Sequence, residues 1–431
     1  MHYLLNLKDF VSVETAINSI ADSITEISLH GRFDITPIEV WVQLVSRIPS
    51  SVTALKLEVL RFNADQLTAI LKVIPSSVTS LNLSGQGLGA YRTGHEIENI
   101  LSAIPLSITT LNLSNNNLCF TNEVLTQTFK FIPSSVRELD LSHNQLNGTR
   151  GPHSIKVTHA QLVQNFRDIP RFITTLNLSG NHLGAAMPVQ ILVEAFRAIP
   201  LSVTALDLSD NELWFIVDGS DSDLLHLAKP ELIALVLQAI PTSIIKLNLS
   251  RNQLNYMTSS QLADVFKALP ISVTILDLSE NDLDRTRMLE QISASEIAHS
   301  FSSLPAGVMV SLRRNSLFLY RRHLERDSLL EELKRGNRIS CNLDLSFNGE
   351  ADFQRALAPM ICFSRKPIST SSESLPLALV EQILSFLVPT KKISSTEIQC
   401  KIQQEIGRLF SIIKDRPSVN NTLSVGIPLQ R

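Results

Sequence analysis

The sequence contains few of the residues that mark disulfide-rich scaffolds, metal sites and disordered chains. Four of its 431 residues are cysteine, and their spacing matches neither a metal-ligand motif nor a dense disulfide framework. Thiols that stay reduced in the cytosol fit this pattern. Charged residues make up 18% of the chain and apolar residues 44%, which supplies a large core and excludes a disordered polyampholyte.

Long apolar runs and an excess of one charge are missing as well. No stretch approaches the roughly 18 uninterrupted apolar residues of a membrane-spanning helix. Lys8 and Asp9 interrupt the apolar N-terminus too early for the core of a signal peptide. The formal net charge of −3 argues against a general role on nucleic acids or on a membrane surface.

The usual motifs of catalysis are also absent from the sequence. It contains no G-x-S-x-G, H-E-x-x-H, Walker or G-x-G-x-x-G pattern, and its ten histidines have no metal-ligand spacing to cysteines or carboxylates. The sequence therefore predicts a protein that is not an enzyme, with no catalytic residue, no metal and no cofactor.

One phrase recurs through most of the chain. Close copies begin at residues 74, 104, 132, 169, 199, 240 and 269, as in IPSSVTSLNLSGQGL and IPLSITTLNLSNNNL. Weaker copies at both ends bring the total to about eleven units within residues 1–349. Pro75, Pro105 and Pro133 are 30 and 28 residues apart, and longer spacings contain insertions. Such a period is typical of a solenoid.

Each unit combines two periodicities. Leu81 and Leu83 alternate with polar residues, as in a half-buried strand. Leu192, Phe196 and Ile199 have the spacing of one helix face, and a proline then ends the helix. Because a helix returns between consecutive strands, the strands must run parallel. The predicted fold is an α/β solenoid with a parallel concave sheet and convex helices.

The pattern V-x-x-L-x-L-x-x-N-x-L, as in Val203 to Leu213, resembles the leucine-rich-repeat family, and the unit length is similar to its ribonuclease-inhibitor-like type. The resemblance implies a horseshoe that binds proteins. It also implies that the repeated asparagine bonds the backbone of a neighbouring loop, here at Asn116, Asn144, Asn181, Asn211, Asn252, Asn281, Asn315 and Asn348. Arg32 and Leu60 replace it in the first two units, which suggests a degenerate cap.

The Ile-Pro-Ser-Ser link and the repeated Leu-Ser resemble the repeats of secreted effectors of the Legionella type. This resemblance implies delivery into the host cytoplasm by a type IV secretion system. The partner would then be a host protein or another bacterial protein.

Three columns of side chains on the concave sheet are candidates for partner contact. The residue between the two strand leucines is mostly Asn or Asp, which fits either an acidic stripe for a basic partner or a polar row that bonds across strands. The columns two residues earlier and directly after Leu-Ser vary more. The candidates in these columns are Glu138, Asp140, His143, Asp207, Asp210, Lys246, Arg251, Asp277 and Glu280.

Insertions fall between a strand and the next helix, so they should line one edge of the solenoid. The longest insertion follows Leu213 and begins with Trp214 and Phe215. These aromatic residues either anchor the loop on the core or serve as an exposed anchor for the partner.

The repeat ends after Asn348, and the composition changes. Residues 350–373 are predicted to form a helical turn and a linker, and residues 374–431 a small helical segment. The start of this segment resembles the first helix of an F-box, which binds the Skp1 adaptor of a cullin ubiquitin ligase. The matching residues are Leu375, Pro376, Leu379, Ile383, Leu384 and Leu387. A helical cap on the solenoid is the alternative.

Three hypotheses for function remain. The first is a protein-binding module, and the second is an F-box-like ubiquitin-ligase adaptor. The third is a GTPase-activating enzyme, an activity known in one family of similar repeats. Nothing in the sequence distinguishes a catalytic Asn or Arg from the repeat residues.

Overall fold

The computed structural model describes residues 2–6, 12–30, 36–58, 62–118, 128–147, 159–185, 187–218, 229–283, 292–305, 308–315 and 343–344. These residues belong to the first of two units, Met1–Phe353 and Gln354–Arg431. Arg32, Leu60 and Asn348, together with the predicted linker and the F-box-like residues, lie outside the described residues.

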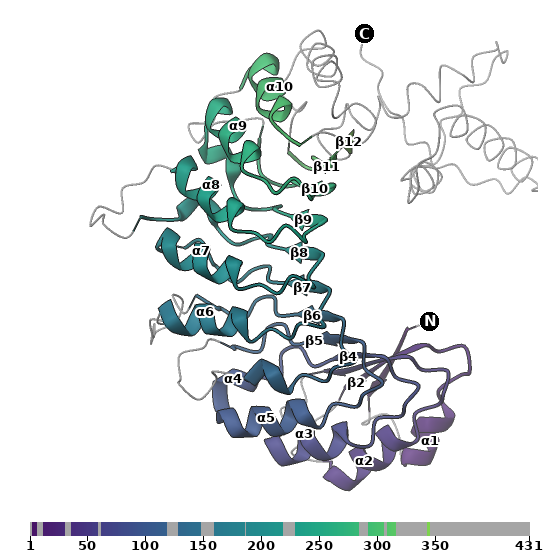
Figure 1. Ribbon diagram of the computed structural model, residues 1–431. Coiled ribbons are helices and arrows are strands. Elements are labelled where there is room, and N and C mark those ends of the chain that lie inside the picture. The colour runs from purple at the N-terminus through teal and green to yellow at the C-terminus, as the bar shows by residue number, and fades with distance from the viewer. Residues whose placement is uncertain are drawn as a thin grey trace, which may run out of the picture. The chain divides into compact units, whose positions relative to one another are not determined.

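A sheet of twelve strands in chain order forms one face of this unit (Figure 1). Every paired neighbour runs parallel. The strands are β1 (His2–Asn6), β2 (Glu26–His30), β3 (Ala54–Glu58), β4 (Ser80–Asn82), β5 (Thr110–Asn112), β6 (Glu138–Asp140), β7 (Thr175–Asn177), β8 (Ala205–Asp207), β9 (Lys246–Asn248), β10 (Ile275–Asp277), β11 (Met309–Ser311) and β12 (Leu343–Asp344). The predicted fold class is confirmed, and β1 adds a strand before the eleven predicted units.

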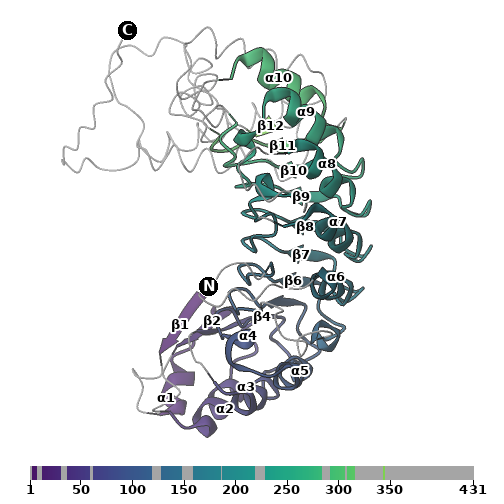
Figure 2. The ribbon, with the colours of Figure 1, turned by 90° about the vertical axis from the view of Figure 1, so that its left-hand side faces the viewer.

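Helices form the opposite face of the unit (Figure 2). The α-helices are α1 (Val13–Asn18), α2 (Ile38–Ser46), α3 (Ala64–Leu71), α4 (Leu88–Tyr91), α5 (Gly94–Ser102), α6 (His159–Arg167), α7 (Val189–Arg197), α8 (Pro230–Gln238), α9 (Ser259–Lys267) and α10 (Ala294–Ser302). Short 3-10 helices lie at η3 (Thr128–Phe131), η4 (Leu213–Phe215) and η5 (Leu254–Tyr256).

Sequence signals explain where these helices begin and end. In α1, α3, α5, α9 and α10, a Ser, Asn or Thr at the N-cap and the residue three positions later bond each other's backbone N–H groups. The repeated proline follows α2, α3 and α5 to α9, and its carbonyl accepts the N–H three residues on, as at Pro200, which accepts from Val203 at 3.0 Å. The chain thereby turns directly from helix to strand.

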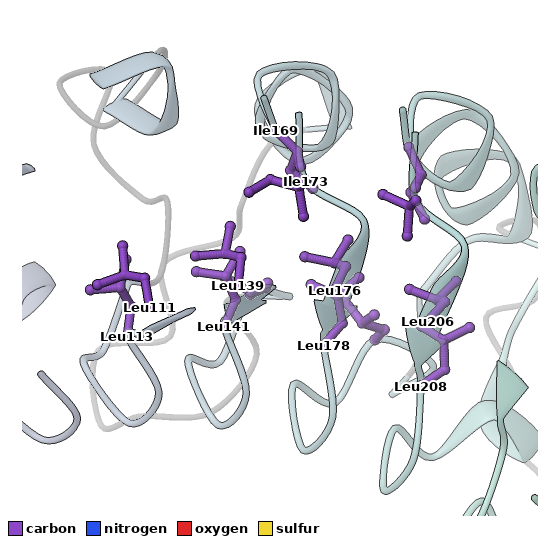
Figure 3. Close-up of a cluster of buried hydrophobic side chains, with 14 of the residues drawn as sticks. Leu111, Leu113, Leu139, Leu141, Ile169, Ile173, Leu176, Leu178, Leu206 and Leu208 are labelled. Atoms are coloured by element: carbon purple, nitrogen blue, oxygen red, sulfur yellow. The ribbon is translucent and has the colours of Figure 1, made fainter. Parts of the chain in front are cut away.

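Stacked aliphatic and aromatic side chains fill the space between sheet and helices. The two leucines of each strand segment from β3 to β10 align with those of the next, and Figure 3 shows four such pairs beside Ile169 and Ile173. On the helix side, Phe166 stacks on Phe196 with ring centroids 6.1 Å apart, and Phe266 stacks on Phe301 at 5.5 Å. Each unit therefore completes the burial of its apolar face by stacking against its neighbours.

Candidate protein-binding surface

The repeated asparagine fixes the loops that follow the strands. The Asn181 side chain is fully buried, and its Nδ2 donates to the carbonyls of Leu141 (3.0 Å) and Leu178 (2.9 Å). Its Oδ1 accepts the backbone N–H of Asn144 at 2.8 Å. The same arrangement recurs from Asn116 to Asn281, and Asn315 makes the corresponding bonds to the unit before it. The role implied by the family resemblance is confirmed.

The Asn/Asp column between the strand leucines shapes the turn at the end of each strand. The Oδ1 atoms of Asp140, Asp207 and Asp277 accept the backbone N–H two residues on, at 2.8–2.9 Å. Asn82, Asn112, Asn177 and Asn248 do the same. A bond across strands joins Asn248 Nδ2 to Asp207 Oδ2 at 2.9 Å. Asn and Asp interchange here because both supply the same acceptor.

The variable column after Leu-Ser has a backbone property that sequence analysis missed. His143, Asp210, Arg251 and Glu280 have φ of 54–57°, in the left-handed region. Glycine occupies the same position at Gly85 and Gly180, and the residue two positions later is left-handed as well. This conformation disfavours β-branched residues. The two glycines and the asparagine Asn115 in this column were the available signal.

Three residues of this column, Arg251, Glu280 and Arg314, form a chain of ion pairs between adjacent units. Arg251 Nε and Nη2 donate to the Glu280 carboxylate at 2.7 and 3.1 Å, and Arg314 Nη1 donates to it at 3.3 Å. The hydrogen bonds from Arg251 hold the pKa of the Glu280 carboxyl below its usual value, and the bond to Glu280 raises the pKa of Arg251. The structure therefore brings Arg251 and Glu280 together as partners of each other.

The remaining concave candidates differ in exposure. Glu138, His143, Asp210 and Lys246 are exposed, whereas Asp140, Asp207 and Asp277 are half-buried. Thr110 donates to the Glu138 carboxylate at 3.3 Å. The in-register neighbours of Lys246 are uncharged, Ala205 on β8 and Ile275 on β10. His143 lies over Gly180, where a Cβ atom would stand 2.3 Å from its imidazole.

The two aromatic candidates pack against the loop of the next unit. Trp214 stacks on Tyr256 of η5 with ring centroids 4.0 Å apart, and on Phe215 at 5.0 Å. Trp214 and Phe215 are half-buried. The chain beyond them returns to the previous unit, where Val217 pairs with Pro188. The stack thus anchors the start of the long insertion and leaves part of each ring accessible.

The described residues also bear on metal binding and membrane insertion. Within the described ranges, no three His, Cys, Asp or Glu side chains lie close enough together to hold a metal ion. None of the described helices has the length and apolar character needed to cross a membrane.

Repeats similar to these are known both from sequence families and from solved structures. Models of the leucine-rich-repeat family match residues 135–156 and 170–186. The crystal structure of the leucine-rich-repeat-containing protein LegL7 from Legionella pneumophila is similar, with a TM-score of 0.60 and 26% sequence identity. The match covers 78% of this chain and 98% of that one. No curated protein matches the sequence.

Proposed function

The chain is a leucine-rich-repeat protein, and we propose that it binds another protein through the concave side chains and following loops of β6 to β10. The observation that carries this proposal is a change of charge from one unit to the next. Asp207 and Asp210 lie on the β8 unit, Lys246 and Arg251 on the β9 unit, and Asp277 and Glu280 on the β10 unit. A partner surface with both charges in matching order would complement this pattern.

The hydrogen-bonded backbone around these side chains favours binding of a protein partner. The Asn column is buried and fully bonded, and the Asn/Asp column holds the strand ends, so both columns position the backbone. The side chains that differ between units then stand on a rigid sheet, which lowers the entropy lost on binding. Tyr256 and the half-buried rings of Trp214 and Phe215 extend the surface onto the loops.

The partner is best found by affinity purification and mass spectrometry from host cells. The full-length chain and a chain lacking residues 365–431 should recover the same protein, because the proposed contact lies in the repeats. Recovery that requires residues 365–431 would contradict the proposal.

The charge pattern is tested on Lys246, whose neighbours in the sheet are uncharged. Lys246→Glu should weaken partner binding at least tenfold and leave thermal stability unchanged, since an exposed charge contributes little to folding. Glu231→Lys, a charge reversal on the exposed face of α8, is the control and should bind normally. Normal binding by Lys246→Glu would exclude a contact at β9.

The ion pair of Arg251 and Glu280 needs a separate design, because it links two units of the chain itself. Arg251→Glu removes both the pair and the cation presented at that position. Adding Glu280→Arg and Arg314→Glu restores both ion pairs with their charges exchanged, since Arg314 also donates to Glu280. If the partner contacts these residues, binding stays weak in the charge-exchanged variant. If the pairs serve only the stacking of repeats, the charge-exchanged variant recovers binding.

A second role is suggested by the F-box-like pattern Leu375 to Leu387, although it lies outside the described residues. As an adaptor, the chain would recruit its repeat-bound target to a cullin ubiquitin ligase. Skp1 should then co-purify with the chain and be lost on Leu379→Asp plus Ile383→Asp. Absence of Skp1 from the native purification would end this proposal.

The proposed setting is the host cytoplasm, with the chain exported by a type IV secretion system. The structural likeness to LegL7 of Legionella pneumophila supports it. A reporter enzyme fused to the chain should become active in host cells only when the bacterium has a working type IV system. Equal activity in a strain without that system would exclude this route.

A further inference from the structure

The edge of the solenoid opposite the loops that follow the strands differs in charge from the rest of the chain. We define the turn edge as the last helical residues and proline turns that precede β5 to β10, residues 102–109, 130–137, 167–174, 197–204, 238–245 and 267–274. Figure 3 shows one of these turns, between Ile169 and Ile173, at the opposite end of its strand from the loop. The proline turns bring these segments to one side of the stacked units.

Basic residues dominate the turn edge. Its one carboxylate is Asp168, and its basic side chains are Lys130, Arg137, Arg167, Arg171, Arg197 and Lys267. All six basic side chains are exposed. The chain as a whole has a formal net charge of −3, so the excess of positive charge here is local. The net charge of the whole chain therefore does not reveal the positive charge of the turn edge.

Close neighbours balance part of this charge. Lys267 pairs with Asp264 at 2.9 Å, and both side chains are largely exposed. Arg167 and Arg197 line an open hollow together with Glu194. Arg137 lies 6.0 Å from the ring centroid of Phe172. The edge therefore stays positive, with Arg137 held near the ring of Phe172.

The turn edge also carries the three most exposed large apolar residues of the described chain. Leu106, Leu201 and Ile271 are 73%, 74% and 89% exposed. Each directly follows the repeated proline, at a position that holds serine at Ser50, Ser76 and Ser134. Nothing in the fold requires an apolar residue there, because the serine units form the same turn.

These aliphatic side chains stand apart from one another. Strands in a sheet are about 4.8 Å apart, so Leu201 and Ile271, two strands apart, are separated by about 10 Å, and Leu106 lies about 14 Å beyond Leu201. Serine, threonine and arginine fill the gaps. A protein partner would favour a contiguous patch with aromatic anchors. A lipid surface accepts isolated aliphatic side chains flanked by cations.

We infer that the turn edge of β5 to β10 docks on an anionic lipid surface, with Leu106, Leu201 and Ile271 entering the interface and the basic side chains facing lipid phosphates. The side of a solenoid suits this contact, because residues at one repeat position form a row that a flat surface can touch along its length. This role is independent of the proposed protein contact, which uses the concave surface and the loops.

Sedimentation with vesicles tests the inference on the full-length chain. It should bind vesicles of phosphatidylcholine with phosphatidylserine, bind phosphatidylcholine alone at least tenfold more weakly, and lose binding as salt rises from 0.1 to 0.5 M. The variant Leu106→Ser, Leu201→Ser, Ile271→Ser should bind at least tenfold more weakly. Arg137→Thr plus Arg171→Ser should cost about fivefold per arginine.

The variants use residues that other units already have at the same positions, so they should keep the native circular dichroism and melting temperature. Leu235→Ser, at an exposed position of α8, is the control and should bind like the native chain. Failure to sediment, equal binding to uncharged vesicles, or full binding by the triple variant would overturn the inference. Binding of polyglutamate without vesicle binding would point to an acidic protein and overturn it too.

Discussion

At the scale of single residues, the buried asparagines carry more structural weight than any other polar side chain of the repeats. The Asn181 side chain forms hydrogen bonds within its own unit and with the unit before it, since Leu178, Leu141 and the N–H of Asn144 all depend on it. Removing a buried partner leaves these groups without compensation for lost hydration.

We expect Asn181→Ala to lower the free energy of unfolding by about 3 kcal/mol or more, because it orphans several buried backbone groups. Urea unfolding followed by circular dichroism measures it. Asn99→Ala on the exposed face of α5 is the matched control and should be nearly neutral. A loss of less than about 1 kcal/mol at Asn181 would show that the loops hold their conformation without the ladder.

The left-handed residues give a second prediction at this scale. Gln253 has φ of 54° and is exposed, whereas Gln238 ends helix α8 and is exposed too. Gln253→Gly should raise the free energy of unfolding by about 0.5 kcal/mol, because it relieves left-handed strain. Gln238→Gly should lower it by up to about 1 kcal/mol. Thermal unfolding of both variants measures these changes. A change of the same sign in both variants would contradict the claim that the left-handed conformation at Gln253 is strained.

At the scale of elements, the helices depend on their caps and on the proline that follows them. In α10, the Glu296 N–H donates to Ser293 Oγ at 3.2 Å, and the Ser293 N–H donates to the Glu296 carboxylate at 2.9 Å. The hydrogen bonds from Ser293 hold the pKa of the Glu296 carboxyl below its ordinary value.

We expect Ser293→Ala to cost about 1 kcal/mol of stability near pH 7. A carboxyl whose folded pKa is lowered stabilises above its unfolded pKa and loses that contribution as pH falls through the folded value. The difference between Ser293→Ala and the native chain should therefore shrink in acid. Unfolding at several pH values measures it, with Ser295→Ala as the exposed control. A difference that grows in acid would refute the capping role of Glu296.

At the scale of the whole molecule, the repeats form a one-dimensional stack in which each unit contacts its neighbours. The described part of β1 pairs with β2 alone, whereas β6, β7 and β8 have a strand on both sides. Stability should therefore fall toward the end of the array.

Hydrogen exchange followed by mass spectrometry should show this gradient. We expect the amides of β1 and β2 to exchange earlier than those of β6 to β8, because opening the end breaks one interface between units instead of two. Uniform exchange across all strands would indicate a single cooperative unit and would contradict the nearest-neighbour description.

Charged side chains are distributed unevenly over the repeats. The concave units β8 to β10 alternate in sign, the loop residues Arg251 and Glu280 pair between units, and the turn edge is positive. A single figure for net charge reports none of these. The two proposed contacts use different sides of the same stack, so a protein and a lipid surface have separate places on it.

The sequence by itself determined the period, the strand and helix faces and the buried leucines. These follow from local patterns of two and three to four residues that each unit repeats. The role of the repeated asparagine was implied by the resemblance to leucine-rich repeats. It missed β1, whose HYLLN segment lacks the repeated phrase.

Only the tertiary structure decided which side chains from different units meet. Arg251 and Glu280 are 29 residues apart and share a column of the repeat, but only the structure shows that their side chains pair and that Arg314, 34 residues beyond Glu280, donates to the same carboxylate. The left-handed loops and the contact of Trp214 with Tyr256 arise in the same way. The stacking of units, set by the whole array of strands, brings them together, and no single repeat contains that information.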